Sequence, residues 1–95
     1  MVTHIVIFKM KDPSPEIIES TRARIAQIEG QIPQLRSLKV GANLVKGEYN
    51  YDLALVATCD TVEDLLVFEQ HPIHLALLQD VMSRYSSFYV VDFES

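Results

Sequence analysis

Histidine and aspartate are the residue types in this chain best suited to acid–base chemistry. Its three histidines are His4, near the start of the sequence, and His71 and His74, which flank a Pro-Ile dipeptide. Asp92 is the odd residue of an apolar segment, and a carboxylate buried there needs a partner. A carboxylate on one imidazole nitrogen fixes the tautomer and leaves the other nitrogen free to take a proton. A histidine–aspartate pair is therefore expected, either as a general base or as a purely structural contact.

Other reactive groups are few. Cys59 is the only cysteine, so no intrachain disulfide can form, and we expect a reducing compartment, the cytoplasm. The adjacent Asp60 would raise rather than lower the pKa of the thiol, which favours a structural role for Cys59. The histidines do not suggest a metal site, because a proline kink separates His71 from His74. With no glycine-rich phosphate loop, serine nucleophile elbow or cysteine cluster, we expect no metal and no cofactor.

The composition describes a small acidic chain. It has 95 residues and a formal net charge of −5, and its length predicts one domain over residues 1–95. The basic residues are scattered singly, which argues against binding to nucleic acid or to an anionic membrane. No apolar run is long enough to span a bilayer, and no signal segment is recognisable. Since 48% of the residues are hydrophobic, so small a domain is expected to cover part of its surface with a second subunit.

The hydrophobic pattern predicts a strand–helix–strand–strand–helix–strand order. We expect strands at 2–10, 35–43, 51–58 and 87–93, and helices at 15–31, 62–70 and 73–85, with a break at His71-Pro72. This β-α-β-β-α-β order fits a ferredoxin-like α+β domain, a four-stranded antiparallel sheet with its helices on one face. Three of the strands are apolar on both sides. We therefore expect a homodimer in which the sheet face bearing Val6 or its neighbours is buried against a second copy, giving an α/β barrel.

Three segments resemble the stress-responsive A/B barrel domain (Dabb, dimeric α/β-barrel) family. They are His4 to Asp12, Tyr51 to Val56, and the His-Pro-x-His element His71 to His74. The likeness covers nearly the whole chain in the expected order. Its most specific part is the His-Pro-x-His element after a short helix, together with a histidine in the first strand. The resemblance implies a dimer whose two sheets join into a barrel.

A polyketide cyclase of this family, to which the chain is distantly similar, implies a site between the sheet and the helices. On the matching positions His74 would be the catalytic base, Asp92 would orient it, and His4 and His71 would line the neighbourhood. Phe68 stands where the cyclase has a tyrosine. The hydroxyl that could polarise a substrate carbonyl is therefore missing, which argues against that cyclisation.

Two functions remain open from the sequence. The first is a homodimeric stress-response-type domain that binds a small apolar or aromatic molecule. The second is a cofactor-independent cyclase or isomerase that uses His74 as general base oriented by Asp92. The observation that best separates these two functions is whether the region beside His74 holds an open, ligand-sized cavity or is filled by side chains such as Phe68 and Met82. The residues expected to contact a ligand are His4, Phe8, Phe68, His71 and Met82.

Overall fold

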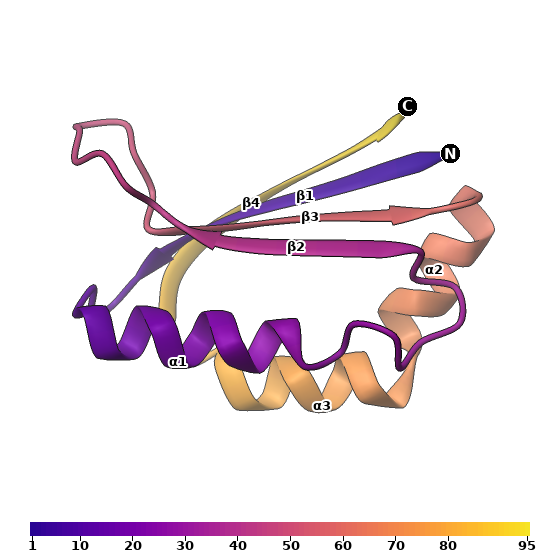
Figure 1. Ribbon diagram of the computed structural model, residues 1–95, viewed down its shortest axis with the longest axis horizontal. Helices are drawn as coiled ribbons and strands as arrows, with labels where there is room; N and C mark the ends of the chain where they lie inside the picture. The colour runs from indigo at the N-terminus through magenta and orange to yellow at the C-terminus, as the bar shows by residue number, and fades with distance from the viewer.

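One layer of the molecule is a four-stranded antiparallel sheet and the other is a layer of three helices (Figure 1). The computed structural model describes residues 1–95. The strands are β1 (Val2–Met10), β2 (Ser37–Ala42), β3 (Leu53–Cys59) and β4 (Tyr85–Glu94), and their order in the sheet is β2-β3-β1-β4. The helices are α1 (Pro15–Ala26), α2 (Val62–Gln70) and α3 (Pro72–Val81). The predicted ferredoxin-like α+β fold is confirmed, with the second helical region divided in two.

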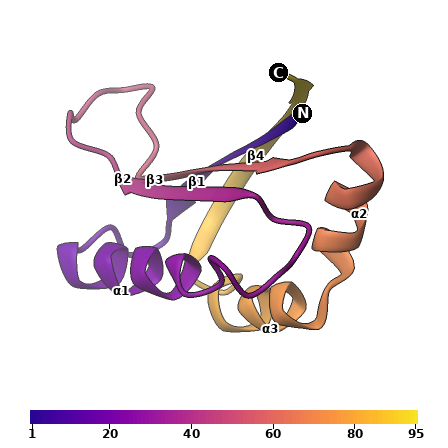
Figure 2. The ribbon, with the colours of Figure 1, turned by 45° about the vertical axis from the view of Figure 1, so that its right-hand side comes forward.

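All three helices cover the same face of the sheet (Figure 2). Side chains of β1 alternate between the two faces, as strand geometry requires. Val6 and Phe8 point under the helices and are buried, whereas Ile5 and Ile7 point to the opposite side, which we call the open face. The sequence predicted that the face left for a partner bears Val6 or its neighbours. Val6 lies on the helix-covered face, and its neighbours Ile5 and Ile7 occupy the open face.

The open face is apolar across three adjacent strands. Ile5 of β1 is paired with Val56 of β3 on one side and with Val91 of β4 on the other. Val56 and Val91 are 39% and 57% exposed, and Tyr89 and Phe93 of β4 are exposed beside them. Monomeric proteins rarely leave such contiguous apolar surface in water.

The first helix begins where the sequence predicts and ends earlier. Ser14 is its N-cap, accepting a hydrogen bond from the backbone N–H of Ile17 at 3.4 Å, and Pro15 occupies the first turn. Regular helix ends at Ala26 rather than near residue 31, because the chain continues in tight turns that include Gly30 at φ +80°. Glycine adopts that left-handed conformation without the clash that a Cβ would cause.

The break between α2 and α3 lies at His71, as predicted. His71 is extended (φ −63°, ψ 138°), the conformation favoured before a proline. Its ring Nδ1 accepts a hydrogen bond from the backbone N–H of Ile73 at 3.1 Å, so the side chain caps α3. Pro72 opens the new helix, where its missing N–H is not needed. The break lets α3 turn back under the sheet and run beside α1 (Figure 1).

The first strand lies inside the sheet, and the last strand pairs with it at the edge, which brings the two chain ends together. β1 pairs with β4 along its whole length, and the backbone N–H of Ser95 donates a hydrogen bond to the carbonyl of Met1 at 2.8 Å. The termini lie at the same end of the sheet (Figure 1). No helix combines the length and the apolar character needed to cross a membrane.

Candidate functional site

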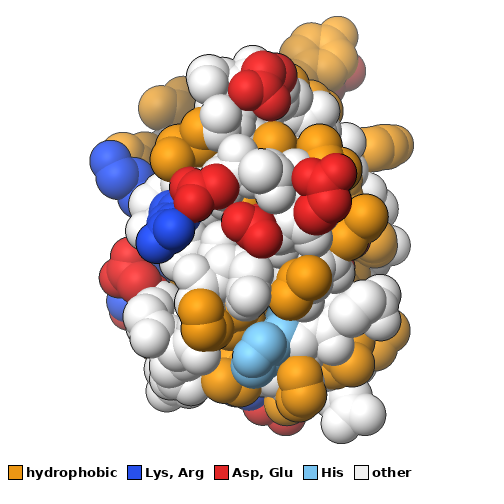
Figure 3. All heavy atoms as spheres, turned by 90° about the vertical axis from the view of Figure 1, so that its right-hand side faces the viewer, with side chains coloured by type: hydrophobic (Ala, Val, Ile, Leu, Met, Phe, Trp, Pro, Cys, Tyr) orange, Lys and Arg blue, Asp and Glu red, His pale blue; other side chains and the backbone are white.

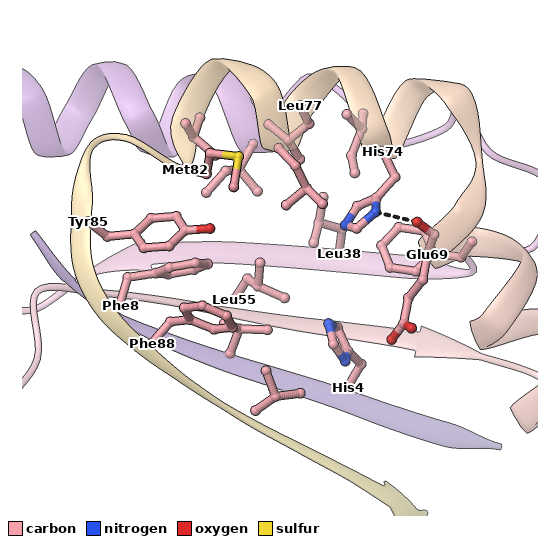
Figure 4. A pocket seen from close by; sticks show the side chains of 17 residues that line it. His4, Phe8, Leu38, Leu55, Glu69, His74, Leu77, Met82, Tyr85 and Phe88 are labelled. Carbon is pink, nitrogen blue, oxygen red and sulfur yellow. Dashed lines mark hydrogen bonds between the residues drawn. The ribbon is translucent and has the colours of Figure 1, made fainter.

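A cavity of about 350 Å³ lies between the helix-covered face of the sheet and α3 (Figure 4). Hydrophobic side chains make up 14 of the 17 that line it, and the remaining three are His4, Glu69 and His74. Leu77, Val81 and Met82 cover it from α3 and the turn that follows, while Phe8, Leu55 and Phe88 come from the strands. The cavity is therefore apolar along most of its length and polar at one end.

Four of the five residues predicted to contact a ligand lie around this cavity. They are His4, Phe8, Phe68 and Met82, and His74 joins them from α3. Phe8 and Phe68 are almost fully buried, whereas Met82 is 57% exposed and lies at the cavity's margin. The ring of Phe68 packs against the ring of His74, with centroids 4.7 Å apart, and lies 6.1 Å from the ring of His4.

Asp92 contacts His4 and not His74, so the predicted His74–Asp92 pair is wrong. The register of β1 and β4 places Asp92 directly opposite His4 on the helix-covered face. Nδ1 of His4 lies 2.5 Å from Oδ1 of Asp92. Because a carboxylate only accepts, Nδ1 carries the proton and Nε2 of His4 is left free. The His4 ring is buried, and the Asp92 carboxylate is 39% exposed at the rim of the sheet.

His74 is held by the backbone instead. Its Nδ1–H donates to the carbonyl oxygen of Glu69 at 2.9 Å, across the break between α2 and α3. That carbonyl is free because it belongs to the last turn of α2, where carbonyls have no partner within the helix. Figure 4 shows the other ring nitrogen of His74 pointing into the cavity. His74 lies on the helix side of the cavity, and His4 lies on the sheet side. The two imidazoles thus face the same space from the helix and from the sheet.

Burial lowers the pKa of His74 below its usual value of about 6.5. The hydrogen bond to Glu69 and the charge of Glu69 oppose this shift, and the nearby His4 adds to it. Desolvation is the largest effect because it disfavours the charged imidazolium. At neutral pH His74 is therefore a neutral imidazole whose Nε2 can accept a proton or a hydrogen bond.

His71 and Cys59 lie outside the cavity. His71 caps α3 with its Nδ1, so its ring has a structural task. Cys59 is fully buried in the core, and burial together with the acids around it raises the pKa of its thiol. This thiol is a poor nucleophile at neutral pH, which agrees with the structural role inferred from the sequence.

Glu69 was missed from the sequence although it lies at the polar end of the cavity. In Figure 4 the side chain of Glu69 extends toward the sheet, and its carboxylate lies at the same height as the His4 ring. One ligand atom from each of His4, Glu69 and Asp92 lies within 4.8 Å of the others, so these three side chains are the ones that could hold a metal ion. The available signal was an acid in the last turn of a helix, where the helix dipole disfavours negative charge.

Comparison with known proteins identifies the family. The stress responsive A/B barrel domain, Dabb, matches residues 2–95. The chain belongs to the Dabb family. The Dabb chain is similar to a dimeric ferredoxin-like protein of unknown function from Thermobifida fusca, with 27% identity, a TM-score of 0.87, and 99% of this chain and 90% of that chain covered.

Two further solved structures are similar to this Dabb chain. A dimeric protein of unknown function from Bacteroides fragilis is 29% identical, with a TM-score of 0.85 and coverage of 99% of this chain and 95% of that one. A hydroxynitrile lyase from Passiflora edulis is 22% identical, with a TM-score of 0.82 and coverage of 97% and 90%. The last likeness is one of fold alone.

The contact between Asp92 and His4 predicts a measurable cost when it is removed. Asp92→Leu leaves the buried Nδ1–H of His4 without an acceptor, and we expect the free energy of unfolding to fall by about 1–3 kcal/mol. Glu94→Leu is the matched control, because Glu94 lies two residues along β4 and makes only an exposed ion pair with the N-terminal amine. That pair is worth about 0–1 kcal/mol. Urea unfolding measures the free energy of unfolding of both variants. Equal decreases in the two would show that the contact between Asp92 and His4 contributes no more stability than the exposed ion pair.

Proposed function

We propose that this Dabb domain binds a small, largely apolar or aromatic molecule between its sheet and its helices. The observation that carries the proposal is the cavity itself, apolar along most of its length with His4, Glu69 and His74 gathered at one end. Small-molecule sites have this character, with mainly hydrophobic walls and a few polar groups that orient the ligand. A volume of about 350 Å³ suits a molecule of one or two fused rings.

The aromatic side chains at the far end support a flat ligand. The ring centroids of Phe8 and Tyr85 are 5.1 Å apart, and those of Tyr85 and Phe88 are 5.4 Å apart. Phe88 is still 50% exposed, so this aromatic cluster retains surface that a ligand ring can cover. Aromatic pairs at such distances add to the stability that burial alone provides.

Filling the cavity should abolish binding. Val90 of β4 lines the cavity and is 43% exposed, so Val90→Trp can place an indole there without disturbing the deep core. We expect the Kd for a neutral aromatic probe, 2-naphthalenemethanol, to rise by about tenfold or more. Binding is measured by the fluorescence of the probe. The control is Val62→Trp, on the exposed side of α2 and outside the cavity. Equal binding by the two variants would contradict the proposed site.

The second part of the proposal is a homodimer formed through the open face. Ile5, Val56 and Val91 make a continuous apolar strip across β3, β1 and β4, and no helix covers them. The similar proteins from Thermobifida fusca and Bacteroides fragilis are dimeric. Two copies packed open face to open face would cover each strip with the other and enclose an α/β barrel between two layers of helices.

A charge on the open face should separate the subunits. Val56→Glu places a carboxylate in the strip, directly beside Ile5, and we expect either a monomer or a loss of folded protein at micromolar concentration. Sedimentation velocity gives the mass, and circular dichroism reports whether the chain is folded. Val62→Glu, which adds the same charge to the exposed side of α2, should leave the dimer intact. A Val56→Glu protein that remains a dimer of wild-type stability would rule out this interface.

Acid–base catalysis is the second candidate function, favoured by how the two imidazoles are held. His4 and His74 both use Nδ1 for a fixed hydrogen bond, and each keeps Nε2 free. His74, neutral and facing the cavity, is the better placed general base, while Asp92 orients His4. Phe68 supplies no hydroxyl beside them, so a substrate oxyanion would have to be stabilised by another group.

Proton exchange tests this function without a known substrate. A benzyl ketone such as phenylacetone, placed in D₂O, exchanges its α protons slowly, and a positioned base accelerates that exchange by about 10²–10⁴-fold. We expect acceleration by the wild type and its loss in His74→Asn, whose amide can still donate to the Glu69 carbonyl. Because the pKa of His74 is lowered, the rate should hold below pH 6.5 before it falls. Wild-type rates equal to those of the variant would exclude His74 as base.

A further inference from the structure

The polar end of the cavity carries negative charge. Glu69 lines the cavity and its carboxylate takes part in no hydrogen bond or ion pair, and Asp92 lies against His4 nearby. No lysine or arginine is among the residues that line the cavity.

The free hydrogen-bonding groups at this end are acceptors. His74 has used its Nδ1–H on the Glu69 carbonyl, and His4 has used its Nδ1–H on Asp92. What each imidazole presents to the cavity is therefore the lone pair of Nε2. The Glu69 carboxylate also only accepts. A ligand group that donates several hydrogen bonds matches this end, and one that only accepts does not.

Nothing in the folded chain requires a carboxylate at position 69. The bond to His74 uses the backbone carbonyl of Glu69, which any residue would supply. A negative charge in the last turn of α2 is also unfavourable in the field of the helix. A residue that violates the charge preference of a helix end, and that makes no stabilising contact in return, indicates a functional role.

The surroundings reinforce the negative potential. Figure 3 shows the end of the molecule formed by α2, where acidic side chains gather with few basic ones among them. Glu63 and Asp64 stand in the first turn of α2, whereas Asp60, just before that helix, is ion-paired with Arg36. Such a field concentrates cations and repels anions at the approach to the cavity.

We propose that the ligand of this cavity is an apolar or aromatic amine, whose ammonium group binds at Glu69 between the two imidazoles, and that Glu69 excludes carboxylates. The proposal rests on the proposed binding function and names the class of molecule that the site takes. The ammonium has N–H donors for the Glu69 carboxylate and the two Nε2 atoms. Its apolar body lies against the aromatic cluster of Phe8, Tyr85 and Phe88.

Three probes of one shape test the charge preference. 2-Naphthylmethylamine is a cation at neutral pH, 2-naphthalenemethanol is neutral and 2-naphthoate is an anion. We expect the wild type to bind the amine about tenfold or more tightly than the carboxylate, with the alcohol between them. In Glu69→Gln the ratio between amine and carboxylate should shrink by about tenfold, while the affinity for the alcohol changes little.

Glu63→Gln is the matched control, because it removes one exposed negative charge from the first turn of the same helix and lies outside the cavity. It should leave the ratio within about twofold of the wild type. Thermal unfolding should show Glu69→Gln at least as stable as the wild type, since the substitution relieves the charge at the helix end. Carboxylate binding as tight as amine binding, or a ratio unchanged in Glu69→Gln, would overturn the amine assignment. Failure of the alcohol to bind the wild type would overturn the cavity proposal itself.

Discussion

The two-sided apolar character of β1 is the constraint on which the rest of this structure depends. β1 lies between β3 and β4 in the sheet, and its residues alternate between two apolar faces. Two-layer packing can bury only one of those faces within a single chain. The helices cover the face of Val6 and Phe8, which creates the core and the cavity. The face of Ile5 and Ile7 is left uncovered, so the cavity and the proposed dimer interface lie on opposite sides of one strand.

The break at His71-Pro72 determines where the chemistry lies. A continuous helix from residue 62 to residue 81 would direct its second half away from the sheet. With the break, α2 ends at Gln70 and leaves the carbonyl of Glu69 unpaired, and α3 begins close enough for His74 to use it. The same few residues therefore end one helix, cap the next and fix the orientation of an imidazole. The cavity exists because α3, held in this way, stands over the sheet without filling all of the space beneath it.

Periodicity and breaker residues were sufficient to predict the strand and helix order, the break at His71 and the ferredoxin-like class. The largest boundary differences were at helix ends: α1 stops at Ala26 because turns continue from there, and α3 stops at Val81 so that β4 can begin at Tyr85. Three of the strands differed by one or two residues at their ends. Of the predicted site residues, His4, Phe8, Phe68, His74 and Met82 line the cavity, whereas His71 lies outside it and the expected pairing of His74 with Asp92 is wrong. His4 and His74 meet at one cavity as expected, yet the acid opposite His4 is chosen by the register of β1 and β4, which periodicity does not specify. Glu69 was missed because an acid at a helix end does not by itself show that its side chain points toward a cavity.

The pairing of β1 with β4 makes this chain nearly a closed loop. The last backbone amide is bonded to the first residue's carbonyl, so a few flexible residues would be enough to join the two ends covalently. New ends could then be opened in the exposed segment 44–50 between β2 and β3, which carries no helix or strand. A circularly permuted version would keep every strand pair and every helix. It would also free the edge of the sheet near Met1 and Ser95 from charged chain ends, a change in surface chemistry achieved without substituting any residue.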